Sequence, residues 1–165
     1  MFALAAGVLM TPPEAPTYAR LAMLRADLKA LVTDLHPQVV VVERVFFQTN
    51  ARTAMAVGQA SGVALLTAAE AGCEVVEYTS NEVKLAVAGH GSASKDQVQR
   101  MVARLLALPE TPRPPDAADA LALAICHLTT VPLRLATAAA IARAEPVRPE
   151  AAAYRAVSTT REALS

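Results

Sequence analysis

The feature that most constrains the fold of this chain is a run of four consecutive valines at positions 39–42, followed directly by Glu43. β-Branched side chains have restricted χ1 angles and fit a pleated strand better than a helix. A strand that is apolar at every position, instead of at alternate ones, is typical of a parallel sheet covered on both faces. The run therefore predicts a buried parallel strand with a carboxylate at its carboxyl end.

Helical patterns flank this strand. Between residues 17 and 35, leucines recur at alternating steps of three and four residues, which is one face of an amphipathic helix, and Pro37 ends it. Residues 50–71 are rich in alanine and predict a second helix, with Gly72 as its C-terminal cap. Residues 73–78 predict the next strand, and Ser80 is expected to be the N-cap of a short helix after it.

Two more helices are expected in the C-terminal half. Ser94 and Gln97 have the spacing of a capping box and predict a helix that begins there. After a proline-rich loop, residues 116–128 predict a last core helix. Residues 2–10 are interpreted as a strand, because they lack the positive charge of a signal peptide and are too few to span a bilayer. This order of elements predicts an α/β fold with a largely parallel sheet.

The length of 165 residues predicts one domain with a single core. We expect residues 1–130 to form this domain and the alanine-rich residues 131–165 to be a tail that is partly helical or disordered. The 15 basic and 15 acidic residues balance, so net charge alone does not indicate a nucleic-acid partner, although a local basic face is still allowed. Cys73 and Cys126 are interpreted as small core residues of a protein in a reducing compartment.

Three carboxylates are candidates for a metal site. Glu43 follows a strand end, where the ligand sites of open α/β sheets lie. Asp116 and Asp119 are three residues apart and share one face of a helix. On this spacing alone, the simpler interpretation of the pair is favoured, namely acids that the helix dipole stabilises. The alternative is a site for Mg²⁺, which is held by one or two carboxylates and substrate phosphates, as in the two-ion sites of many nucleases.

Cationic and aromatic side chains are the next candidates. Lys84, Lys95 and Arg100 could bind DNA phosphates, although each one taken singly is more simply a solvated helix residue. Lys95 is the strongest of them, because a cation at a helix N-terminus opposes the dipole and needs another explanation. Phe46 and Phe47 lie in a loop after Glu43. One of the two could fill the core, and the other could stack on an unpaired base, a contact worth roughly 1–3 kcal/mol.

Four blocks of the sequence together resemble the RuvC family, the Holliday-junction resolvases of bacteria. They lie at residues 40–46, 57–63, 82–95 and 116–122, and the resemblance extends from about Phe2 to His127. It implies a ribonuclease-H-like mixed sheet flanked by helices. It also implies a cytoplasmic homodimer, without a membrane segment, that cuts four-way DNA junctions symmetrically in recombination and repair. RuvA and RuvB, the branch-migration proteins, are partners that the resemblance alone implies.

The resemblance also assigns roles to the carboxylates and the ions. Glu43, Asp116 and Asp119 match catalytic, metal-binding positions of the family. The implied cofactor is Mg²⁺, with Mn²⁺ as an alternative, and two ions per active site. The helix at residues 50–71 matches the region that helps to form the dimer, and its small residues would allow close packing.

For the DNA, the resemblance points to three residues. Lys84 and Lys95 match lysines that are tied to DNA binding and catalysis, and Phe46 matches an aromatic residue that stacks near the junction centre. Arg100 is a DNA-binding candidate only because cationic side chains near a metal site could bind phosphates, which applies equally to Arg104.

One departure from the family matters. The family begins with a strand that carries an Asp-Pro-Gly motif, whose aspartate completes the metal site, and no such motif exists here. Residues 2–11 resemble the family's third strand, so we expect the first two strands to be missing and a valine-rich edge to be unpaired. The simplest hypothesis is that the true start lies upstream. The alternatives are a junction-binding protein that does not cut, because one metal-binding aspartate is absent, or an inactive fragment.

Overall fold

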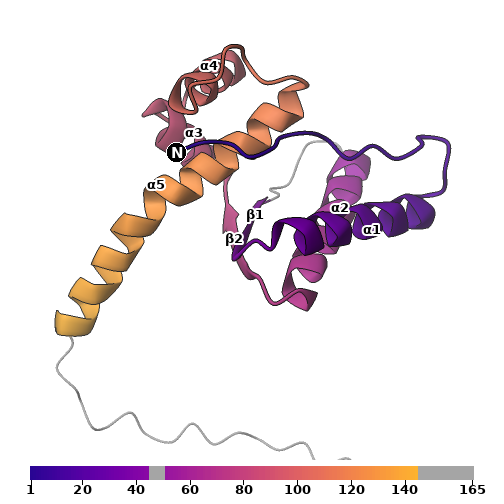
Figure 1. Cartoon of the computed structure of the whole chain (residues 1–165), viewed down its shortest axis with the longest axis horizontal. Helices are drawn as coiled ribbons and strands as arrows, with labels where there is room; N and C mark the ends of the chain where they lie inside the picture. Colours follow the sequence, from indigo (N-terminus) through magenta and orange to yellow (C-terminus); the bar gives the residue numbers. More distant parts are fainter. Residues whose placement is uncertain (45–50, 145–165) are drawn as a thin grey trace, which may run out of the picture. The chain divides into compact units, whose positions relative to one another are not determined.

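The computed structural model describes residues 1–44 and 51–144 of the chain. Contacts divide the chain into two units, Met1–Pro132 and Leu133–Ser165, and the fold described below is that of the first. The elements in chain order (Figure 1) are α1 (Thr17–Leu35), β1 (Val39–Glu43), α2 (Ala51–Glu70), β2 (Glu74–Tyr78), α3 (Ser80–Ala88), α4 (Lys95–Leu105) and α5 (Pro115–Ala144).

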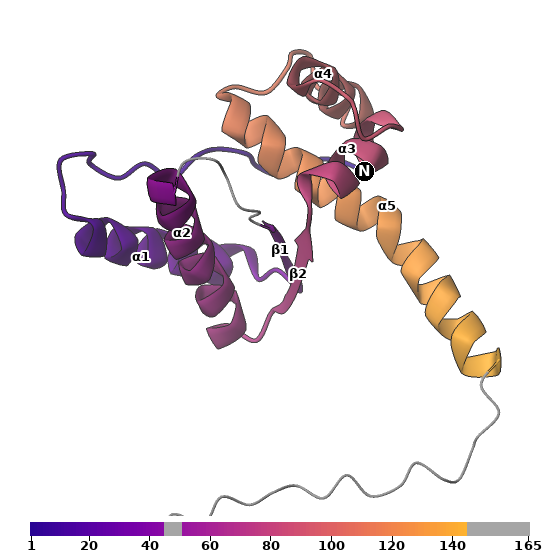
Figure 2. The same ribbon diagram turned by 180° about the vertical axis from the view of Figure 1, so that it is seen from behind.

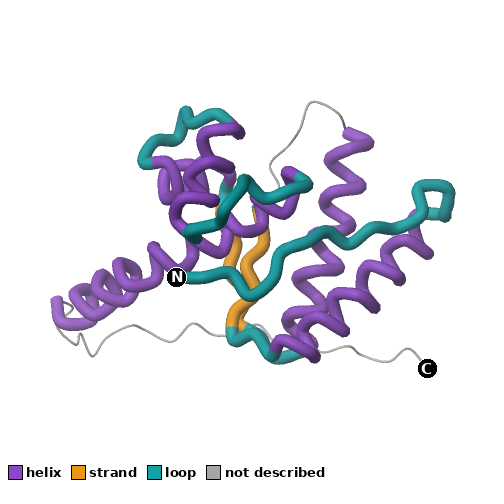
Figure 3. Tube along the Cα trace, turned by 45° about the horizontal axis from the view of Figure 1, so that its top comes forward, coloured by secondary structure: helices purple, strands orange, loops and turns teal. Residues whose placement is uncertain are grey.

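The two strands pair in parallel, with Val41 opposite Val76 and Glu43 opposite Tyr78. Helix α2 connects them, which makes a β–α–β unit, the connection that parallel strands require. Figure 3 shows the strands side by side. From the front and from behind (Figures 1 and 2), α1 and α2 lie on one side of them and α3 and α4 toward the other, while α5 begins above the strands and runs across toward the side of α3. The predicted parallel pairing of these two segments is confirmed.

The valine strand is less buried than its sequence predicts. All four valines of β1 are half-buried, whereas Val76 and Tyr78 of β2 are buried. Within the described residues the sheet has two strands, and β1 pairs with β2 alone. A strand with one neighbour keeps one edge and part of both faces uncovered. The expected valine-rich edge is therefore present in the part of the chain that the structure describes.

The prediction of a strand at residues 2–10 is wrong. This segment has no regular secondary structure, and its large side chains are exposed, with Phe2 at 78% and Leu4 at 84%. A strand is stable only when its backbone groups are paired with a neighbouring strand, and among the described residues this segment pairs with neither β1 nor β2. Apolar composition alone did not make it a strand.

The core lies between β2 and the helices α3, α4 and α5. Its most buried large side chains are Val102 at 0%, Ile125 at 1% and Cys126 at 1%. The sequence interpretation of Cys126 as a small core residue is confirmed, whereas Cys73 is only half-buried. Small alanines on α5, such as Ala118 and Ala122, are also buried. They bring the start of α5 close to its neighbours.

Two helix starts test the predicted caps. The N-cap of α3 is Thr79 and not Ser80: the Thr79 hydroxyl accepts from the Glu82 N–H at 3.2 Å, and the Glu82 carboxylate accepts from the Thr79 N–H at 2.7 Å. A capping box needs an acid or amide three residues after the cap. Glu82 meets this condition for Thr79, whereas Val83 cannot meet it for Ser80. The capping box of Ser94 and Gln97 at α4 is confirmed.

Helix α5 is longer than predicted, because it begins at Pro115 and continues past Leu128 to Ala144. The start of the predicted tail is therefore helical, and residues 145–165 lie outside the described residues. The stretch Pro115–Ile141 is long and apolar enough, by length and composition, to cross a membrane. Its buried residues before Pro132 belong to the core of the first unit, which accounts for their apolar character.

Candidate active site

A cavity of about 260 Å³ lies where β1 ends. It is formed by side chains from one strand and three helices, which are far apart in the sequence. The residues that line it are Glu43, Ser80, Val83, Lys84, Lys95, Val98, Asp119, Ala122 and Leu123. Two carboxylates and two ammonium groups from four elements thus meet at one opening.

Glu43 is the last residue of β1 and is exposed at the cavity. Its backbone is held in register opposite Tyr78, and the Arg44 N–H continues the ladder by donating to the Tyr78 carbonyl at 2.8 Å. The Ser80 hydroxyl, at the start of α3, donates a hydrogen bond to Oε1 of Glu43. Strand pairing therefore fixes the position of Glu43, and Ser80 fixes the direction of its carboxylate.

Lys95 and Asp119 form an ion pair across the cavity. The Lys95 Nζ lies 2.9 Å from the Asp119 Oδ2, and the two side chains are 57% and 43% exposed. The hydrogen bond and the charge of Asp119 raise the pKa of Lys95 above its ordinary value, and the charges of Asp116 and Glu43 add to this effect. The three predicted carboxylates thus act together on one ammonium group, which explains a cation at the N-terminus of α4.

The donor set fits a hard divalent cation. Glu43 and Asp119 offer carboxylate oxygens to one cavity, and Mg²⁺ is typically held by one or two carboxylates together with substrate phosphates. Within residues 1–44 and 51–144, no group of three His, Cys, Asp or Glu side chains lies close enough to hold one ion. The arrangement therefore suits an open site that a phosphate completes, rather than a cage made by the protein alone.

The other predicted site residues lie at different distances from this cavity. Lys84, on α3, lines it. Asp116 is exposed in the first turn of α5 and does not line it, although its charge reaches Lys95. Arg100 is exposed on α4 and also lies outside the lining. Phe46 falls outside the described residues.

Sequence reasoning missed two hydrogen-bonded pairs, Ser80 with Glu43 and Tyr78 with His127. Ser80 was assigned to a cap, although the spacing of Thr79 and Glu82 already indicates the true cap and leaves the Ser80 hydroxyl available. The second pair is Tyr78 and His127: the Tyr78 hydroxyl lies 3.2 Å from the His127 Nδ1, with the rings edge to face at 6.0 Å. No local pattern reveals this pair, because it joins β2 to α5.

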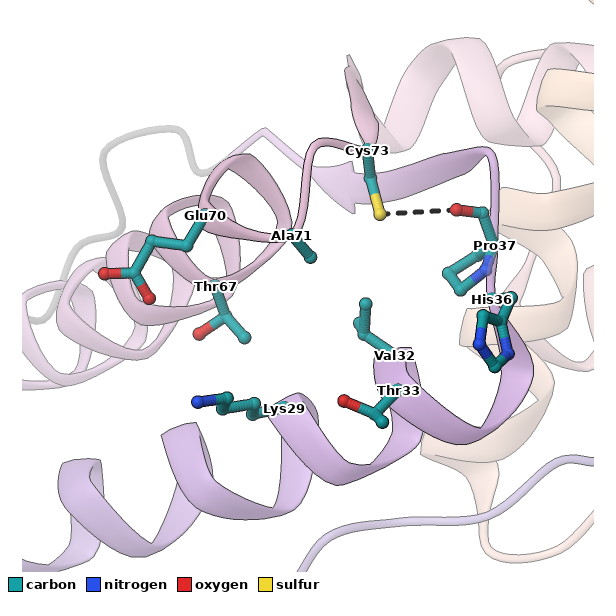
Figure 4. A pocket seen from close by; sticks show the side chains of 9 residues that line it. All are labelled: Lys29, Val32, Thr33, His36, Pro37, Thr67, Glu70, Ala71 and Cys73. Carbon is teal, nitrogen blue, oxygen red and sulfur yellow. Dashed lines mark hydrogen bonds between the residues drawn. The ribbon is translucent and has the colours of Figure 1, made fainter.

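A larger cavity, of about 490 Å³, lies near the start of the two strands (Figure 4). Three of its polar groups have partners. The Cys73 thiol donates to the Pro37 carbonyl at 3.3 Å, and the Thr67 hydroxyl donates to the Val63 carbonyl at 2.7 Å. Glu70 pairs with Arg25 at 2.5 Å. This cavity is lined by one carboxylate, Glu70, which is already paired, whereas the cavity at Glu43 is lined by two, Glu43 and Asp119.

Solved structures with a similar fold define the class of protein. RuvC of Thermus thermophilus superimposes with a TM-score of 0.73 at 38% identity, over 79% of this chain and 78% of that chain. The same protein in complex with a Holliday junction substrate gives a TM-score of 0.71 at 35% identity. The fold is therefore the ribonuclease-H-like α/β fold of a junction nuclease.

Sequence comparisons give the family. The family model "Crossover junction endodeoxyribonuclease RuvC" matches residues 1–127. The curated RuvC of Moorella thermoacetica is 52% identical over 126 residues, which are 76% of this chain and 75% of that protein. The RuvC of Salinispora arenicola is 53% identical over 137 residues, 83% of this chain and 78% of that protein. This chain belongs to the RuvC family of crossover junction endodeoxyribonucleases.

Family membership confirms three predictions made from the sequence: the RuvC resemblance, the ribonuclease-H-like α/β fold, and an endonuclease that resolves Holliday junctions. The catalytic, metal-binding and DNA-binding roles of individual residues stay predictions, as does the division into residues 1–130 and 131–165.

Proposed function

We propose that this chain cuts four-way DNA junctions at the cavity beside Glu43, by symmetric, metal-dependent phosphodiester hydrolysis in DNA recombination and repair. The observation that carries the proposal is that Glu43 and Asp119 line one cavity together with Lys84 and Lys95. Carboxylate oxygens suit hard divalent cations, and ammonium groups suit phosphates. The cavity thus combines the two recognition elements that a metal-dependent nuclease needs.

The proposed metal-binding and catalytic residues are Glu43, Asp116 and Asp119, with Mg²⁺ as the ion, Mn²⁺ as an alternative, and two ions per site. When bound, such ions lower the pKa of a water molecule and stabilise the leaving oxygen. Glu43 and Asp119 offer their oxygens inside the cavity, and Asp116 adds negative charge from the first turn of α5. Their common effect on Lys95 supports this grouping.

The proposed DNA contacts use cations on α3 and α4. Lys84 would bind phosphate at the cavity. Lys95, which pairs with Asp119, would also bind phosphate there, and a divalent cation held by the carboxylates would supply the positive charge that Asp119 then needs. Arg100 is exposed on the same helix as Lys95 and binds phosphate further along the backbone. Phe46 is proposed to stack on an unpaired base near the junction centre.

The proposed assembly is a homodimer in the cytoplasm, because two symmetric cuts in one junction need two copies of the site. Helix α2 is the proposed dimer helix, since its alanines and glycines permit close packing and much of its surface is exposed. RuvA and RuvB are proposed as partners that move the junction.

A second candidate function is junction binding without cutting. It is favoured by the absence, among the described residues, of a group of three acidic or other ligating side chains around one ion. The same lysines would then bind phosphates, and the carboxylates would lack the ions that hydrolysis needs. Metal-dependent nicking separates the two candidates, because the binding protein shifts a four-way junction in a gel without nicking it in Mg²⁺ or Mn²⁺.

The first prediction concerns the two cavity carboxylates. Glu43→Gln or Asp119→Asn should lower the rate of junction cutting roughly 100-fold or more, because a ligand of the catalytic metal ion is lost. Junction binding should be kept, because removing a negative charge reduces repulsion of phosphate. The measurements are cleavage of a labelled four-way junction in Mg²⁺ and a gel-shift titration without it.

The matched control is Asp27→Asn, which removes an exposed carboxylate on α1 and should leave both measurements unchanged. A normal cutting rate in either cavity variant contradicts the site assignment. Loss of cutting in the control as well would mean that the rate reports a general charge effect.

A further inference from the structure

The two carboxylates of the cavity are held by chemically different donors. Asp119 is held by the charged ammonium of Lys95 at 2.9 Å. Glu43 is held by the neutral hydroxyl of Ser80, which donates to its Oε1, and it forms no ion pair within the described residues. A charged donor competes with an incoming cation for its carboxylate, whereas a neutral donor leaves the negative charge in place.

The position of Ser80 in its helix makes the hydroxyl available. Thr79 is the N-cap of α3 and satisfies the Glu82 N–H, so Ser80, as the first helical residue, has no capping role. The N–H groups of the first turn need no partner within the helix, and serine itself is only a moderate helix former. The side chain of Ser80 is therefore free to turn toward the end of β1.

A long carboxylate side chain at a strand end has three rotatable bonds and is exposed to solvent. One hydrogen bond to Oε1 restricts the carboxylate of Glu43 to the orientations that keep that oxygen on Ser80. Oε2 is not used by this hydrogen bond, and Glu43 lines the same cavity as Asp119. Such outer partners orient metal ligands, and their loss typically costs about 10- to 100-fold in metal affinity or activity.

We infer that Ser80 is a positioning residue, which acts through Glu43 by holding one carboxylate oxygen and leaving the other oriented for a divalent cation. This inference rests on the proposed role of Glu43 as a metal ligand. The expected effect of Ser80 is on the affinity of the site for the cation in the absence of DNA.

The test is calorimetric titration of Mn²⁺ into the full chain without DNA. Ser80→Ala should raise the Kd for Mn²⁺ about 10-fold, because the carboxylate loses its orientation. Ser80→Thr keeps a hydroxyl on the same β-carbon and should restore the wild-type Kd. Ser92→Ala, which removes an exposed hydroxyl that pairs with His90 outside the cavity, is the matched control and should bind Mn²⁺ as the wild type does.

A second readout separates positioning from damage to the fold. In Ser80→Ala, the Mn²⁺ concentration that gives half the maximal cutting rate should rise, while the rate at saturating Mn²⁺ stays near that of the wild type. Junction binding without metal and the urea midpoint should not change. A lower maximal rate with an unchanged Mn²⁺ Kd overturns the inference.

The double variant distinguishes this inference from the proposal on which it rests. If Glu43 is the ligand and Ser80 acts through it, Ser80→Ala should have no further effect on the Mn²⁺ Kd when Glu43→Gln is already present. An unchanged Kd in Glu43→Gln alone contradicts the proposed function. A weakened Kd in Glu43→Gln together with a normal Kd in Ser80→Ala contradicts only the role of Ser80.

Discussion

The two sides of the sheet are packed to different degrees. On the side of β2, the helices α3, α4 and α5 bury a common core, with Val102 at 0% and Ile125 at 1% exposure. On the side of β1, helix α1 has no buried residue, and Leu31 and Leu35 are 43% and 57% exposed. Burial of apolar surface is the main source of folding free energy. The β2 side therefore carries most of the stability within the described residues.

The candidate site lies across this difference. Glu43 comes from β1, on the weakly covered side, whereas Asp119, Lys84 and Lys95 come from the helices that share the buried core. The two carboxylates that are proposed to bind metal, Glu43 and Asp119, therefore depend on regions of unequal stability. Three substitutions test this contrast, in order of decreasing expected effect.

The largest effect is expected from Ile125→Ala. Removing most of a fully buried side chain leaves a cavity and should lower the free energy of unfolding by about 2–5 kcal/mol. The matched change on the other side is Leu31→Ala, whose side chain is 43% exposed and whose loss should cost less than about 1 kcal/mol. Urea denaturation of both variants gives the two values. Equal losses of unfolding free energy in the two variants would contradict the inference that the β2 side carries most of the stability.

A smaller effect is expected from Tyr78→Phe. Tyr78 is 4% exposed, and its hydroxyl is 3.2 Å from the His127 Nδ1. Deleting the hydroxyl while keeping the ring should cost about 0.5–1.5 kcal/mol, because one buried hydrogen bond is lost. The same urea measurement checks it, with Tyr18→Phe on the exposed face of α1 as the control. If Tyr78→Phe lowered the free energy of unfolding as much as Ile125→Ala does, the loss would be too large for a single hydrogen bond between β2 and α5.

The smallest effect is expected from the exposed ion pair of Lys95 and Asp119. The pKa of Lys95 is raised in the folded state, so its stabilising contribution is complete below the unfolded value of 10.5 and is lost as pH rises through the folded value. Lys95→Met should therefore cost about 0.2–1 kcal/mol at pH 8 and low salt, and the difference should vanish at strongly alkaline pH. Urea midpoints at several pH values measure it.

The pair of Arg25 and Glu70 is a suitable control for that experiment. Its two side chains are 43% and 47% exposed, close to those of Lys95 and Asp119, but a guanidinium stays charged at alkaline pH. Arg25→Met should therefore cost a similar amount at pH 8 and keep that cost when the pH is raised. If the stability difference from the wild type disappeared at alkaline pH in both variants, the cause would be general alkaline unfolding and not titration of Lys95.

Local patterns predicted most of the elements. The valine run gave the parallel strand β1, the leucine spacing gave α1, and the capping box of Ser94 and Gln97 gave the start of α4. The prediction of a strand at residues 2–10 was wrong because a strand needs a neighbouring strand for its backbone hydrogen bonds. Local sequence does not show whether such a neighbour is available. Burial of the valine strand was overestimated for the same reason.

The site was predicted only as a set of residues. Glu43 could be placed at a strand end from sequence, and the fold brings it to the same cavity as Asp119. The ion pair of Lys95 with Asp119 and the hydrogen bond of Ser80 to Glu43 could not be predicted from spacing, because each joins elements whose relative position comes from packing. The one local signal that was overlooked was the capping box of Thr79.

The unequal packing has a consequence for the order in which this protein loses its properties under stress. Local opening begins where few side chains are buried, so β1 and α1 loosen before the core around β2. On the proposed assignment, a chain in that state would keep Lys84 and Lys95 on the packed helices for a DNA backbone, while Glu43 would leave the cavity that Asp119 lines. We therefore expect mild heat or denaturant to abolish cutting before it abolishes junction binding.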